Sequence, residues 1–195
     1  MKLNKNIKKY LALSLITIGV SIVSCDLDKH KKDTYLFNPD LKKEKIKTNI
    51  EEGKVLSEVT ILNETILKLS ELALTESGEY NIYTIANKLK KDNTEIKNSI
   101  IELAKAKLII LPNGFNKADV NRLLLVDEDG FSKAYLGRTG KLLEREIARL
   151  EYLSSITNDL DFKVFIVKSL TRLNHDLDQL NKKTIKLLTI KNSIL

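Results

Sequence analysis

Apolar residues recur with helical spacing in two long segments of the 195-residue chain. In the first segment, steps of four and three residues place the apolar positions on one face of a helix of about twenty residues. These positions are Val55, Val59, Leu62, Ile66, Leu69 and Ala73. From Asp161 towards the end of the chain the same alternation covers about three heptads. Its positions are Ile166, Leu170, Leu173, Leu177, Leu180, Thr184 and Leu187. The pattern predicts two long helices with matching apolar faces.

Between these segments the sequence predicts shorter helices. One is expected over Tyr83–Leu89, and a second over Thr94–Lys107 with Asn93 or Thr94 as its N-cap. A third should begin near Gly140, with Thr139 as its cap and apolar residues again spaced by three and four. Two long helices with shorter ones between them indicate a helical bundle.

Two short apolar runs interrupt this pattern. The run 108–111 ends at Pro112-Asn113-Gly114, and the run 123–126 ends at Asp127–Gly130, both of which are turn signals. Runs of this length fit a strand and the end of a buried helix equally well. The fold prediction is therefore a mainly all-α bundle with a long C-terminal helix. Around residues 108–126 it includes either a small β-hairpin, as in a winged helix, or helix ends packed into the core.

The first 25 residues have the organisation of a secretion signal. A lysine-rich start precedes the uncharged segment Tyr10–Val23, which is shorter than the roughly 20 apolar residues of a membrane-spanning helix. Ile22-Val23-Ser24-Cys25 resembles the lipobox of bacterial lipoproteins, and Cys25 is the only cysteine in the chain. The resemblance implies cleavage between Ser24 and Cys25, an S-diacylglycerol group on the Cys25 thiol and acylation of its amine. We therefore expect a signal peptide over residues 1–24 and a lipid anchor in the membrane.

Charge changes this picture after cleavage. Residues 1–24 contain four lysines and no acidic residue, so their loss lowers the formal net charge from +7 to +3. This small excess gives little support to nucleic-acid binding, and no nucleic-acid partner is expected. Residues 25–53 are polar and dense in charge, which predicts a flexible tether after the lipidated Cys25. A helical domain should then occupy residues 54–195, and without disulfides it depends on its own core.

No segment carries a catalytic or cofactor motif. H-E-x-x-H, G-x-S-x-G, G-x-x-x-x-G-K and G-x-G-x-x-G are all absent from the sequence. His30 lies in the expected tether and His175 in the expected last helix, and neither has an expected catalytic partner. Asp127–Gly130 begins like a calcium loop, but Phe131 and Arg138 occupy the fifth and twelfth positions, where ligands are needed. We therefore expect no catalytic residue, no cofactor, no metal site and no enzymatic activity.

The segment Tyr80–Leu111 resembles a winged helix-turn-helix, with a short helix, a turn, a second helix and an apolar run before the wing. The resemblance implies a set of DNA-facing residues. Asn93, Thr94, Glu95, Lys97 and Asn98 would face the major groove, and Lys88, Lys90 and Lys91 would lie near phosphates. An exported protein does not meet the chromosome, so we expect such a shape to serve packing or protein contact instead.

The whole chain resembles spirochaete surface lipoproteins in its lipobox at Cys25, its charged tether and a helical body rich in Lys, Asn and Ile. Among these, the helical complement-regulator-binding family is the most similar. The resemblance implies a lipid-anchored protein on the outer membrane surface that binds a host protein in adhesion or immune evasion. It also implies a homodimer through the C-terminal helix. A structural or assembly lipoprotein in the periplasmic leaflet is the alternative function, and a winged-helix DNA-binding protein is a more distant one.

Overall fold

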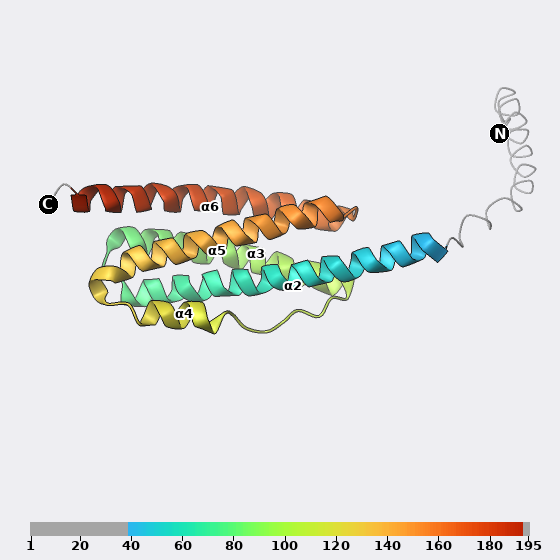
Figure 1. Cartoon of the computed structure of the whole chain (residues 1–195), viewed down its shortest axis with the longest axis horizontal. Coiled ribbons are helices and arrows are strands. Elements are labelled where there is room, and N and C mark those ends of the chain that lie inside the picture. Colours follow the sequence, from blue (N-terminus) through green and yellow to red (C-terminus); the bar gives the residue numbers. More distant parts are fainter. Residues whose placement is uncertain (1–38, 193–195) are drawn as a thin grey trace, which may run out of the picture. The chain divides into compact units, whose positions relative to one another are not determined.

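The computed structural model describes residues 39–192, with side chains placed for residues 43–185. The chain divides into two compact units, Met1–Lys45 and Ile46–Leu195, and every contact discussed below lies within the second. The helices are α2 (Pro39–Glu76), α3 (Tyr80–Lys107), α4 (Lys117–Leu124), α5 (Glu128–Ile156) and α6 (Leu160–Asn192) (Figure 1). No strand occurs among residues 39–192, so the prediction of a mainly all-α helical bundle is confirmed.

The long helices α2, α3, α5 and α6 lie side by side (Figure 1). The short helix α4 packs against α5. Three-residue connections join α2 to α3 and α5 to α6, so each pair is antiparallel. The longer segment 108–116 leads from the end of α3 along the bundle to α4 (Figure 1). The core consists of aliphatic and aromatic side chains from all five helices. Its largest fully buried members include Tyr135, Phe162, Leu56, Ile66, Leu89, Ile100, Leu123 and Leu143.

The apolar face predicted for the first helix is confirmed, because all six of its positions are buried in α2. However, α2 begins at Pro39, so residues 39–53 are helical where the sequence predicts a flexible tether. Part of this stretch has tertiary partners that its composition does not reveal. Glu52 is buried and accepts a 2.6 Å hydrogen bond from the hydroxyl of Thr157, and Gly53 lies against Ile109.

The apolar face predicted for the last helix is confirmed in α6 from Ile166 to Leu180, while Thr184 is partly buried and the side chain of Leu187 lies outside the described residues. Ile166, Leu173 and Leu180 are buried, while Leu170 and Leu177 pack against the core and are partly buried. The buried face is wider than a heptad seam, because α6 packs against both α3 and α5. Its additional buried members are Phe162, Phe165, Ser169 and Asp176.

The two helices predicted over Tyr83–Leu89 and Thr94–Lys107 are one continuous helix, α3. Asn93 is not an N-cap but a fully buried residue in its middle. Its amide donates to the carbonyl oxygen of Leu89 at 2.9 Å, and its Oδ1 accepts from Asn63 at 3.0 Å. Because the helix has no turn at this point, the helix-turn-helix resemblance is wrong.

The hairpin alternative for residues 108–126 is wrong as well. The second apolar run begins in the last turn of α4 and continues two residues beyond it. The N-cap of α4, Asn116, accepts a 3.0 Å hydrogen bond from the backbone N–H of Ala118. Leu123 of this run is buried, which agrees with the helix-end alternative. The first run is packed on one side only: Ile109 and Leu111 lie against the core and are partly buried. Leu108 and Ile110 are 91% and 93% exposed, and Leu108 ends α3 in the left-handed conformation with φ 57°.

Helix α5 begins earlier than predicted. Asp127 is its N-cap and accepts a 3.0 Å hydrogen bond from the N–H of Gly130, so the acidic turn signal is the start of a helix. Glu128 and Asp129 follow in the first turn, where negative charge interacts favourably with the helix dipole. Thr139, predicted to be a cap, is fully buried within α5.

Candidate functional site

The predicted lipidation and cleavage site, Ser24 and Cys25, lies outside the described residues. In the described part of the chain, none of the helices combines the length and the apolar character needed to cross a bilayer. His175 is exposed on α6, and His30 also lies outside the described residues. Among residues 43–185, whose side chains are described, there is no group of three or more His, Cys, Asp or Glu arranged to hold a metal ion.

The residues predicted to face the major groove do not all share one surface. Thr94, Lys97 and Asn98 line a small groove together with Glu64 of α2. Asn93 is buried, as described above. Lys97 forms an ion pair with Glu64 of α2 at 2.6 Å, and Glu95 forms one with Arg172 of α6 at 2.6 Å. These side chains therefore join α3 to its neighbours.

A polar layer crosses the core of the bundle, with one side chain from each long helix. Asn63 of α2, Asn93 of α3, Glu146 of α5 and Asp176 of α6 are at most 1% exposed. Burial raises the pKa of Glu146 to about 8; Asn63 opposes this shift and the charge of Asp176 adds to it. Neither carboxylate oxygen of Glu146 has a hydrogen-bond partner among the described residues. At neutral pH the carboxyl group of Glu146 is therefore mainly protonated.

Asp176 differs from Glu146 because it has a cationic partner. Burial raises the pKa of Asp176 to about 6, against the opposing effect of Lys88. Burial alone would lower the pKa of Lys88, but hydrogen bonds to Asp176 and Asp92 outweigh it and raise this pKa. Neither Glu146 nor Asp176 lines the surface grooves described below. We interpret the polar layer as a structural feature that specifies the relative positions of the four long helices in the bundle.

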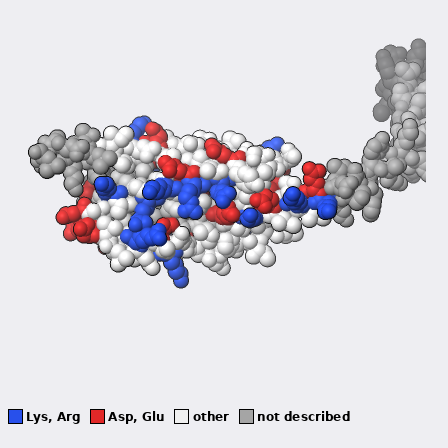
Figure 2. Space-filling model, viewed as in Figure 1, with Lys and Arg blue, Asp and Glu red and all other residues white. Residues whose placement is uncertain are grey.

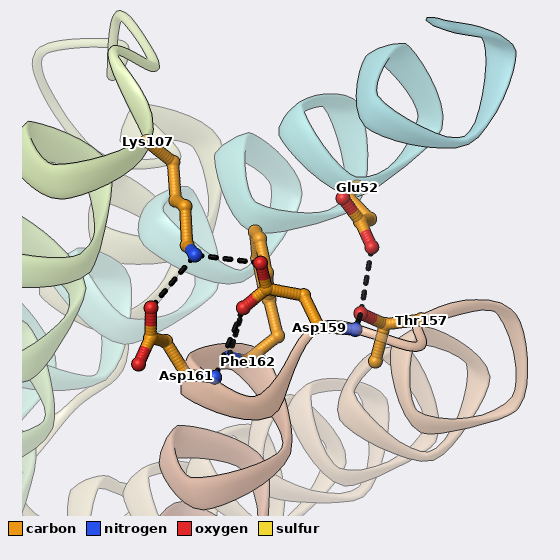
Figure 3. Close-up of polar contacts among 6 residues, drawn as sticks. All are labelled: Glu52, Lys107, Thr157, Asp159, Asp161 and Phe162. Carbon is orange, nitrogen blue, oxygen red and sulfur yellow. Dashed lines mark hydrogen bonds and ion pairs between the residues drawn. The ribbon is translucent and has the colours of Figure 1, made fainter. Parts of the chain in front are cut away.

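A second polar cluster fixes the junction of α5 and α6 (Figure 3). The hydroxyl of Thr157 donates to Glu52 of α2 and accepts from the N–H of Asp159 at 3.1 Å. Lys107, the last residue of α3, reaches Asp159 at 2.6 Å and Asp161 at 2.7 Å. Hydrogen bonding to Asp159 raises the pKa of Lys107, and the same contact lowers the pKa of Asp159. The cluster thus connects α2 and α3 to the start of α6.

Asp159 also caps α6. Its Oδ1 accepts from the backbone N–H groups of Asp161 at 2.9 Å and Phe162 at 3.3 Å (Figure 3). These are donors of the first turn, which have no partner within the helix. All side chains of the cluster therefore have structural partners, which makes this junction a poor candidate for a ligand site.

Two adjoining grooves on the outer side of α5 form a better candidate. One, of about 600 Å³, lies between α4 and α5, and the other, of about 690 Å³, lies between α2, α5 and the segment that leads to α4. Leu142 and Arg145 line both grooves, so we treat them as one site, the arginine groove. Its basic residues are Lys54, Arg122, Lys133, Arg138, Lys141, Arg145 and Arg149.

Arginine is concentrated in this groove. The chain has 28 lysines but only five arginines. Four of the five, Arg122, Arg138, Arg145 and Arg149, line the groove, whereas only three of the lysines do. The planar guanidinium group can donate two parallel hydrogen bonds to one oxyanion, which an ammonium group cannot do. The selective placement of arginine therefore points to recognition of oxyanions.

Only two of these cations have an anionic partner that also lines the groove. Arg149 pairs with Glu58 at 2.9 Å, and Arg122 lies 3.9 Å from Asp119. The ion pair of Lys54, at 3.9 Å, is with Glu51, which does not line the groove. The other four basic residues have no ion pair with any side chain of residues 43–185. They are Lys133, Arg138, Lys141 and Arg145.

The positive charge of the groove is thus only partly compensated. Its seven cations face only two lining carboxylates, which leaves an excess of five positive charges. The Nε atom of Arg138 is buried without a hydrogen-bond partner among the described residues. Figure 2 shows lysine and arginine side chains gathered on the face of the bundle that carries α4 and α5. Such a concave basic surface attracts anionic ligands.

Sequence reasoning missed this groove, although a signal was present. Arginine is rare, and four of its five occurrences fall between residues 122 and 149. Spacing alone does not show that Arg122 of α4 faces the same groove as Arg138 and Arg145 of α5, because that depends on how the two helices pack.

One of three comparisons with known proteins gives a match. No curated protein and no solved structure matches the chain. A family described as "Domain of unknown function (DUF4142)" matches residues 41–182, which is well over half of the sequence and includes both the polar layer and the arginine groove. The chain therefore belongs to the DUF4142 family.

Proposed function

We propose that the protein is a lipid-anchored bacterial outer-surface lipoprotein without enzymatic activity, which binds an acidic host macromolecule through the arginine groove. The observation that carries this proposal is the placement of four of the five arginines in one groove with an excess of positive charge. In this proposal Cys25 carries the lipid, and the body acts in adhesion or immune evasion, as in spirochaete lipoproteins.

A binding role is consistent with the chemistry of the groove. Its charged groups are mainly guanidinium and ammonium ions, which keep their charge at physiological pH and serve well for holding an anion. The carboxyl groups with raised pKa values, Glu146 and Asp176, are enclosed in the core and do not line the groove. The site therefore supports electrostatic recognition better than general acid–base catalysis.

The anchor and the location have their own test. Metabolic labelling with palmitate should label the natural chain, and Cys25→Ser should abolish the label. Protease treatment of intact cells should degrade the protein on the outer surface. Survival until the envelope is broken would instead support the alternative, a structural or assembly lipoprotein in the periplasmic leaflet.

Binding is tested by capture from host serum. The natural lipoprotein, held in detergent, should retain an acidic serum or cell-surface component, and Arg138→Gln/Arg145→Gln should retain much less. Arg172→Gln is the matched control, because it removes the one arginine that lies outside the groove. Equal capture by all three proteins would exclude the groove as the binding site.

The predicted homodimer through the C-terminal helix stays a prediction. Leu173 and Leu180 of its seam are buried within the bundle and are not free to meet a second copy. A dimer would have to use the outer face of α6, where Val164 and Val167 are 47% and 66% exposed. Sedimentation of Val164→Lys/Val167→Lys against the natural protein would test that face.

A further inference from the structure

We infer that the ligand of the arginine groove is a linear sulfated polysaccharide, held along α5 through its sulfate groups. This inference rests on the proposed function in that it takes the groove as the binding site. It goes further by assigning the chemical class and the shape of the ligand.

The spacing of the cations favours a polymer over a small anion. Every fourth residue of α5 from 133 to 149 lines the groove, and four of these five positions carry a cation: Lys133, Lys141, Arg145 and Arg149. The fifth position is Gly137. Four residues of an α-helix rise about 6 Å and rotate about 40° beyond one full turn, so the row extends over roughly 24 Å along the axis and winds about 160° around it. One phosphate or sulfate would meet only one or two of these side chains. A flexible chain with anions at regular intervals would meet all of them.

Gly137 leaves room for such a chain. It lies in the groove, and no atom lies within 4 Å of the position that its Cβ would take. A longer side chain there would fill the space between Lys133 and Lys141. In an interior helical position glycine destabilises a helix relative to alanine, so the open space has no evident benefit for the stability of α5.

Sulfate suits the donors of the groove. Its oxygens can accept two parallel hydrogen bonds from the N–H groups of one guanidinium ion. Each of these charge-assisted hydrogen bonds is about twice as strong as a neutral one. Arg138 has a buried Nε without a partner among the described residues, so an anion at its terminal nitrogens would compensate a charge that is now poorly balanced.

The absence of stacking partners argues against nucleic acid. The described residues that line the arginine groove include no Phe, Tyr or Trp. Single-stranded nucleic acids are usually held by stacking of bases on aromatic side chains, in addition to contacts with phosphates. A polysaccharide whose recognition depends on its sulfates needs no such platform.

The concave shape argues against a membrane surface. The cations lie in grooves between α4 and α5 and between α2 and α5. A flat layer of anionic headgroups meets protruding lysines best, whereas a flexible chain can enter a groove. Of the two sources of clustered anions, we therefore choose the polysaccharide.

The test measures binding of the natural lipoprotein in detergent to heparin by calorimetry. Heparin fragments longer than about 24 Å, which can follow the row around the helix, should bind, and a disaccharide should bind much more weakly. Affinity should fall as salt rises. Arg138→Gln and Arg145→Gln should each weaken binding about tenfold, as expected for loss of one charged hydrogen bond. Arg172→Gln should bind like the natural protein.

Gly137→Glu provides an independent variant. Glutamate is a better helix former than glycine and meets no atom within 4 Å at Cβ, so the helix should fold. Its carboxylate would enter the row of cations and should abolish heparin binding. Circular dichroism of the same sample confirms that the fold is intact, and unchanged heparin affinity in this folded variant would overturn the assignment.

Other ligands give distinguishable outcomes. Equal affinity for desulfated heparin, or tighter binding of a single-stranded oligonucleotide or of vesicles with anionic phospholipids, would overturn the sulfated polysaccharide. If heparin does not bind but serum capture still depends on Arg138 and Arg145, this inference fails and the proposed function stands. If serum capture does not depend on these arginines, the proposed function fails.

Discussion

Replacing Glu146 with glutamine should remove a pH-dependence of folding that the burial of this carboxyl group creates. Glu146 is fully buried in α5, and its carboxylate oxygens have no hydrogen-bond partner among the described residues. Glutamine has nearly the same shape and no charge. Its amide can donate to Oδ1 of Asn63, which also has no partner among these residues.

The sign and size of the effect follow from the pKa. In the unfolded chain Glu146 has its ordinary pKa of 4.5, and in the folded protein burial raises this pKa to about 8. Between these values the folded state holds a proton that the unfolded state has lost, so the free energy of unfolding decreases as pH rises. At about 1.4 kcal/mol per pH unit, the full difference is about 5 kcal/mol. That is comparable to the whole stability of a small domain.

The measurement is urea unfolding followed by circular dichroism at several pH values. Asp176 also has a raised pKa, of about 6, so its effect on stability is nearly complete by about pH 6.5. From there to pH 8, the natural protein should lose about 2 kcal/mol and Glu146→Gln should lose almost nothing. Glu144→Gln, a change at an exposed carboxylate on the same helix, should behave like the natural protein. A Glu146→Gln variant with the same loss as the natural protein would refute the reasoning.

Three further changes test the packing. Leu108→Gly should raise the free energy of unfolding by about 1 kcal/mol, because Leu108 is exposed and has a positive φ that favours glycine; a decrease in urea unfolding would contradict this. Thr157→Val should lower it by about 1–3 kcal/mol, because buried Glu52 loses its hydroxyl donor, and Thr157→Ser is the control that should restore it. Leu173→Asp should unfold the bundle, because it places a carboxylate in the core; a folded monomer seen in sedimentation would show that this position is not internal.

The apolar faces of α2 and α6 could be predicted from the sequence because burial on one side of a helix leaves a period that needs no knowledge of its neighbours. Val59 and Ile66 of α2 and Leu173 of α6 are buried as this period predicts. The heptad pattern does not predict that Asp176 is buried, because a carboxylate next to an apolar face is normally read as part of the solvent-exposed face. Only the position of Lys88 on α3 explains it.

Local rules fail at polar residues inside helices. The preference of Asn and Thr for helix starts predicts N-caps at Asn93 and Thr139. In the bundle, Asn93 instead bonds to Asn63 across the core, and Thr139 lies fully buried in α5. A polar residue in a helical stretch can mark either a helix start or a buried polar contact, and only the neighbouring helix distinguishes them.

Helix α5 separates two polar systems on opposite faces. Thr139 and Glu146 belong to the buried side, whereas Lys141 and Arg145 line the arginine groove. Because different partners hold the two faces, Arg145→Gln should weaken ligand binding without changing the pH-dependence of unfolding. Glu146→Gln should do the reverse. If calorimetry and urea unfolding show both effects in one variant, the core layer and the groove are coupled, and the groove cannot be treated as a rigid surface on an independent scaffold.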